Sequence, residues 1–93
     1  MKSEADFIND LVSRFSTEVT LAMTEMRAAG VEYPVANQIV RKAIAHIGAI
    51  AIASTAATDR CDRTQLLADF EARLRALLNL LPGRLVPRSA GGR

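Results

Sequence analysis

The sequence contains no tryptophan, and phenylalanine and tyrosine together supply only 4% of its 93 residues. Any hydrophobic core must therefore be built mainly from Leu, Ile, Val, Ala and Met. Side chains of this kind suit the interdigitation of helices better than the facing layers of a β-sandwich. The scarcity of aromatic residues favours an all-α fold.

Cysteine and histidine occur once each, as Cys61 and His46. A single cysteine excludes an intramolecular disulfide and a cysteine-based metal site within one chain, and we expect a reducing, cytoplasmic location. The acidic start MKSEAD and the amphipathic stretch after it do not match a secretory signal peptide. We interpret His46 as a core or interface residue, and Cys61 as a partly exposed thiol.

Residue combinations that carry catalysis or bind cofactors are also missing from the sequence. It has no glycine-rich phosphate-binding loop, no paired acids at inward-facing positions, and no Ser/His/Asp set that can be placed together. We therefore predict a protein that is not an enzyme, with no catalytic residues, no metal site and no cofactor.

Charged side chains are absent from residues 43–58, in the middle of the chain. When the segment from Pro34 to about Ala57 is drawn as a helix, it is apolar on all sides from Ala43 onward. Such a helix belongs inside a bundle or a membrane. A β-strand over residues 47–53 is the minor alternative, because alanine is a poor strand former.

Small side chains recur along this helix at intervals of four residues, and they form one row on its surface. A row of alanines lets another backbone approach closely. The flanking helices, each with one apolar stripe, can cover only part of the central helix, and a second copy of the same surface is the simplest cover for the rest. We therefore predict a homodimer or higher homo-oligomer whose interface includes Ala45, Gly48, Ala49, Ile52, Ala53 and Ala57.

Apolar residues at alternating spacings of three and four predict a helix on either side of the central one. Ser3 with Asp6 marks the start of the first helix as a capping box, and Gly30 marks its end; Asp62 with Gln65 offers a similar start for the last helix. The first stripe is Ile8, Val12, Phe15, Val19, Ala22, Met26 and Ala29, and the last is Leu67, Phe70, Leu74, Leu77 and Leu81.

These patterns predict helices near residues 4–29, 34–57 and 63–81, within a single helical domain formed by residues 1–83. The fold class is an all-α, three-helix antiparallel bundle or hairpin unit, which homodimerisation completes. On the outer faces, acidic and basic residues four apart predict ion pairs. They are Asp10 with Arg14 and Arg14 with Glu18, Asp69 with Arg73, and Glu71 with Arg75.

The last ten residues contain three arginines, Arg84, Arg88 and Arg93. The formal net charge of the chain is +2, and without these three charges residues 1–83 carry −1. Residues 85–88, LVPR, resemble part of the thrombin cleavage sites used in expression vectors. We interpret residues 84–93 as an engineered remnant or, if they are native, as a flexible basic arm.

A self-associating interaction module, such as an adaptor, a regulator or a small assembly component, is the leading functional hypothesis, and it leaves room for an unidentified protein partner. The first alternative is a DNA-binding helix-turn-helix, with Arg63, Thr64 and Gln65 at the start of the recognition helix. Asp59, Asp62 and the −1 charge of residues 1–83 argue against nucleic acid as a partner.

A membrane-associated protein is the second alternative, because residues 43–58 are uncharged. As a helix this run is about 24 Å long, at about 1.5 Å per residue. The hydrocarbon core of a bilayer is about 30 Å thick. The run also contains His46 and many weakly apolar alanines, so membrane association ranks last.

Deletion of residues 84–93 should leave the melting temperature unchanged within error, because these residues offer no periodic apolar face that a core would bury. Thermal denaturation of the full and shortened chains, followed by circular dichroism, measures this. A clear loss of stability in the shortened chain would show that the tail belongs to the folded domain.

Overall fold

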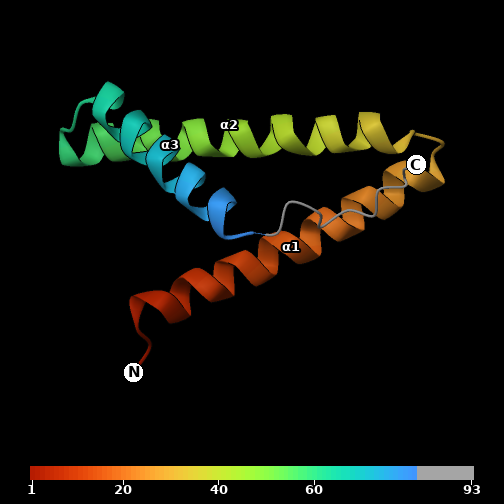
Figure 1. The fold of residues 1–93 in the computed structure, drawn as a ribbon, viewed down its shortest axis with the longest axis horizontal. Helices are drawn as coiled ribbons and strands as arrows, with labels where there is room; N and C mark the ends of the chain where they lie inside the picture. Colours follow the sequence, from red (N-terminus) through yellow and green to blue (C-terminus); the bar gives the residue numbers. More distant parts are fainter. Residues whose placement is uncertain (82–93) are drawn as a thin grey trace. The chain divides into compact units, whose positions relative to one another are not determined.

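The computed structural model describes residues 1–81, and the regular structure in this range is entirely helical. Three helices follow one another along the chain: α1 (Glu4–Ala28), α2 (Tyr33–Asp59) and α3 (Arg63–Leu80) (Figure 1). The all-α prediction is confirmed. The strand alternative is wrong, because residues 47–53 lie inside α2. The end of the predicted domain, at residues 82 and 83, and the predicted tail over residues 84–93 lie outside the described residues.

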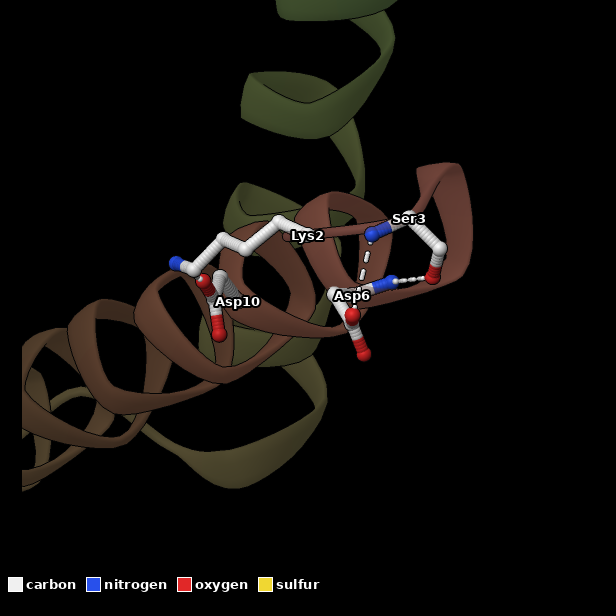
Figure 2. A network of polar contacts seen from close by, with 4 residues as sticks. All are labelled: Lys2, Ser3, Asp6 and Asp10. Atoms are coloured by element: carbon white, nitrogen blue, oxygen red, sulfur yellow. Dashed lines mark hydrogen bonds and ion pairs between the residues drawn. The ribbon is translucent and has the colours of Figure 1, made fainter.

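Helix α1 begins with a capping box at Ser3, as the sequence predicts (Figure 2). The backbone N–H of Asp6 donates to Ser3 Oγ at 3.2 Å, and the backbone N–H of Ser3 donates to Asp6 Oδ2 at 3.0 Å. Each bond satisfies one of the backbone donors that a helix N-terminus leaves without a partner. The start of α1 is therefore fixed by residues that are neighbours in the sequence.

Few of the charged side chains on these helices form ion pairs. Lys2 with Asp10 is the one ion pair found among residues 1–81 (Figure 2). None of the four predicted pairs forms, and those predictions are wrong: Asp10 with Arg14, Arg14 with Glu18, Asp69 with Arg73, and Glu71 with Arg75. Exposed ion pairs gain little energy, because water solvates the separated charges well and the side chains lose entropy when they pair.

Helix α3 begins at Asp62, whose side chain accepts a hydrogen bond from the backbone N–H of Thr64 at 3.2 Å. Asp62 is therefore the N-cap, as predicted. Gln65 does not complete a capping box, because its Nε2 donates instead to Asp69 Oδ1, one turn further on, at 2.9 Å.

The turn between α1 and α2 is a Schellman motif with Gly30 in the left-handed region, at φ 91°. The N–H of Gly30 donates to the carbonyl of Arg27 at 3.0 Å, and the N–H of Val31 donates to the carbonyl of Met26 at 2.9 Å. Glycine suits this position because it has no Cβ to clash with the backbone. The prediction that Gly30 ends the first helix is confirmed.

The turn between α2 and α3 also has a residue in the left-handed region, but this residue is not a glycine. Arg60 follows the last residue of α2 and adopts φ 56°, a left-handed conformation that residues with a Cβ rarely take. A left-handed conformation costs a non-glycine residue about 1–2 kcal/mol. The packing of the flanking helices must offset this cost.

The described chain divides into two compact units, and the boundary between them lies within α2, between Gly48 and Ala49. In the first unit, α1 packs on the first half of α2 around Ala36, which is fully buried. The half-buried residues beside that contact lie in the second half of α1, the turn and the start of α2: Val19, Ala22, Met23, Met26, Val31 and Val40. In the second unit the half-buried residues are Ile52, Ala53, Thr55, Ala56 and Leu66.

Three threonines on α1 return their hydroxyl groups to their own helix. The Oγ1 atoms of Thr17, Thr20 and Thr24 donate to the carbonyls of Ser13, Ser16 and Thr20 at 3.0, 2.9 and 3.0 Å. Each of these bonds spans four residues, so the hydroxyl shares a carbonyl that already accepts a helical hydrogen bond. The hydroxyl groups of this face are therefore satisfied by the backbone beneath them.

Replacing Gly30 with alanine should lower the free energy of unfolding by about 1 kcal/mol, because a Cβ is disfavoured at this φ. Apart from Gly30 and its two chain neighbours, no residue has an atom within 4 Å of the position of that Cβ, so the loss would report backbone strain rather than a clash. Arg60→Gly should do the opposite and raise stability by up to about 1 kcal/mol, whereas Arg60→Val should lower it. Urea unfolding midpoints of the three variants decide between these signs.

Candidate interaction surface

Apolar side chains are exposed along all three helices. Ala36 is the one buried hydrophobic residue among residues 1–81, and twenty large hydrophobic residues of the same range are exposed. Single apolar residues on a surface are normal, but extended apolar patches mark places where another molecule binds. A surface that bound another molecule through apolar contacts would therefore include some of these residues.

Helix α1 and the first half of α2 line an apolar groove with a volume of about 380 Å³. It lies wholly within the first compact unit, Met1–Gly48. Glu18, from α1, is the one charged residue that lines it. The other lining residues are Phe15, Val19, Ala22 and Met26 from α1 and Ile39, Val40, Ala43, Ile44 and Ile47 from α2.

A second, shallower hollow lies in the other unit, between the second half of α2 and α3. Its volume is about 340 Å³, and two of its lining residues, Asp69 and Arg73, are charged. Ile52 of α2 lines it together with Leu66 and Phe70 of α3. This is where α3 contacts the apolar surface of α2.

The six residues of the predicted interface differ in exposure. Ala45, Ala49 and Ala57 are exposed, whereas Gly48, Ile52 and Ala53 are half-buried within the chain. Part of the predicted surface therefore lies against the chain's own atoms, as Ile52 does beside α3. The exposed alanines remain accessible to a second helix.

The single histidine and the single cysteine are both exposed. His46 is therefore not a core residue of the chain, and its role at an interface stays a prediction. Cys61 lies in the turn before α3, with its Sγ 3.7 Å from the carbonyl oxygen of Asp59. Within residues 1–81, no three His, Cys, Asp or Glu side chains are grouped so that they could hold a metal ion.

The helix-turn-helix hypothesis depends on the N-terminus of α3. In the structure, the Asp62 carboxylate occupies that end and accepts the hydrogen bond from Thr64. A phosphate that approached Arg63 would meet this negative charge. The geometry of the turn therefore offers no support for binding of a nucleic-acid backbone there.

The membrane hypothesis depends on α2. This helix is long and apolar enough to cross a membrane, with a mean hydropathy of 1.3 over its best 18-residue window and none of that window buried. One such helix is weak support, because the core helices of soluble proteins have the same length and composition.

Comparison of the chain with known protein families, with characterised proteins and with solved structures finds no match. The functional proposal therefore rests on the physical character of the surfaces described above. Both hollows are lined mainly by apolar side chains.

The groove depends on the turn that sets α1 against α2, and Arg27 fastens that turn. Its Nη1 donates to the carbonyl of Val31 at 2.8 Å, and its guanidinium lies 4.4 Å from the centroid of the Tyr33 ring. One side chain thus joins the end of α1 to the first residue of α2. Arg27→Ala removes both contacts at once.

We expect Arg27→Ala to lower the free energy of unfolding by about 1 kcal/mol, the sum of a modest exposed cation–π contact and one hydrogen bond. Arg27→Lys should lose less, because the cation above the ring is retained. Arg14→Ala is the control, since Arg14 makes no ion pair within the described part of the chain. Equal losses for Arg27→Ala and Arg14→Ala in denaturant titrations would contradict a fastening role.

Proposed function

We propose that the protein is a non-enzymatic, self-associating helical module that acts in the cytoplasm as an adaptor, a regulator or a small assembly component. The observation that carries this proposal is the exposure of twenty large apolar residues in a chain with a single buried one. A surface of this kind has no chemistry to perform, but it binds other apolar surfaces strongly.

The exposed apolar surface also bears on the stability of the helices themselves. Covering a half-exposed Leu, Ile or Phe contributes about 1 kcal/mol, and an ordinary domain is stable by only about 5–15 kcal/mol. Helices in proteins owe most of their stability to packing of their apolar faces rather than to intrinsic propensity. A partner surface is therefore needed for the chain to remain folded as three long helices.

A second copy of the chain is the simplest partner, because it is present wherever the protein is present and carries the same apolar residues. A two-fold axis brings one surface against its own counterpart. On α2, Ala45 and Ala49 are exposed and small, so the backbone of another helix could approach closely there. These alanines support the interface predicted from the sequence.

Association with a membrane through α2 is the second candidate, favoured by the length and hydropathy of that helix. It differs from self-association in a simple observable. A membrane protein would float with liposomes and need detergent to stay in solution, whereas a self-associating module would remain soluble without either.

Replacing Ala49 with phenylalanine should shift the mass in solution towards smaller species, because the larger side chain overpacks a contact made by small residues. Such overpacking costs about 1–3 kcal/mol. The matched control is Ala72→Phe, on an exposed position of α3. Multi-angle light scattering over a range of concentrations measures the mass of each variant.

Two outcomes would count against the proposal. A wild-type chain that stays monomeric at high concentration would overturn self-association altogether. If Ala49→Phe instead assembled like the wild type, the alanine row would be removed from the interface, while self-association through another surface would stand.

A further inference from the structure

We propose that the apolar face formed by α1 and the first half of α2, which contains the groove, packs against the same face of a second copy. Two α1–α2 hairpins would then face each other across a two-fold axis and form a four-helix bundle. This inference rests on the proposed self-association and names the surface that carries it. It adds a second contact surface to the alanine row on which the sequence prediction placed the interface.

The spacing of the apolar residues fits a four-helix bundle. On α1 the stripe that enters the groove has alternating spacings of four and three, and on α2 the positions 36, 40, 43 and 47 have the spacings four, three and four. Seams of this kind pack against other helices at a shallow angle in antiparallel bundles. One hairpin supplies two of the four helices, so two hairpins complete the bundle.

The uncovered area on this face, if it is fully covered, reaches the lower end of what a stable dimer needs. Seven large apolar residues there are between 40 and 55% exposed, and they continue the groove towards the start of α1: Ile8, Leu11, Val12, Phe15, Ile39, Ile44 and Ile47. At roughly 180 Å² for each residue fully exposed, they offer on the order of 600 Å² per copy. Two copies would bury about 1,200 Å², the lower end of the range for stable interfaces.

The composition of the groove favours an apolar occupant. Glu18 is its single charged lining residue, so a strongly basic or acidic partner would find almost nothing to pair with. The cores of protein interfaces are likewise depleted in charge. An apolar helical surface fits the groove, and the chain itself carries one of matching length and spacing.

The groove and the alanine row lie on nearly opposite faces of α2. With about 3.6 residues per turn, Ile44 and Ile47 point away from Ala45 and Ala49. Substitutions on the two faces therefore test different contacts. This separation allows a failure of the groove proposal to be recognised while self-association itself is confirmed.

The test introduces aspartate at matched positions inside and outside the groove. Phe15 and Ile44 line it, whereas Leu21 is on another face of α1, and the three residues are 51, 52 and 54% exposed. Phe15→Asp and Ile44→Asp should each raise the dissociation constant of the assembly by about 30-fold or more, because an unpaired charge would be buried at the contact. Leu21→Asp should assemble like the wild type.

Cross-linking keeps the proposal testable if the aspartate variants fail to fold. In a Cys61→Ser background, Ile44→Cys and Leu21→Cys each provide one thiol for a short bis-maleimide. Ile44→Cys should give covalent dimers, and Leu21→Cys should not. Circular dichroism shows whether each variant keeps the helix content of the wild type.

Each result decides between the two proposals. A wild type that is monomeric at high concentration would overturn both of them. An assembly that survives Phe15→Asp and Ile44→Asp, with no cross-link from Ile44→Cys, would overturn the groove proposal alone. Loss of assembly in both aspartate variants, together with a cross-link from Ile44→Cys, is the result that we expect.

Discussion

The constraint on which the rest of this structure depends is that the three helices bury little of the apolar surface that their own sequence supplies. Helix α2 is 27 residues long and carries no charged side chain over residues 43–58, yet Ala36 is its single buried residue. Because an isolated helix gains little from its backbone hydrogen bonds alone, its persistence depends on lateral contacts. The turns, caps and hairpin contacts of this chain place apolar faces where such contacts can form.

Local features of the fold could be predicted from the sequence because their energetics are decided within a few residues. The capping box at Ser3 and Asp6, the cap at Asp62 and the end of α1 at Gly30 each depend on hydrogen bonds between close neighbours. The helical periodicity is equally local, since it repeats every three or four residues. Nothing distant can easily override these preferences.

Other features escaped prediction because alternatives of similar energy compete. Asp10 was expected to pair with Arg14 but pairs with Lys2, and water makes either arrangement nearly equivalent. Arg60 takes a left-handed conformation although it is not a glycine, so its residue type gives no sign of this backbone direction. The groove was missed for a different reason: periodicity shows that a helix has an apolar stripe, but not how much of it a neighbouring helix will leave uncovered.

The threonines of α1 alter what the polar side of that helix presents to its surroundings. Because the hydroxyls of Thr17, Thr20 and Thr24 already donate to backbone carbonyls, their hydrogens need no further partner at the surface. This face is therefore less hydrophilic than its sequence indicates, and little hydration would be lost if another surface packed on it. The polar and apolar faces of α1 are accordingly less sharply separated than its amino-acid composition indicates.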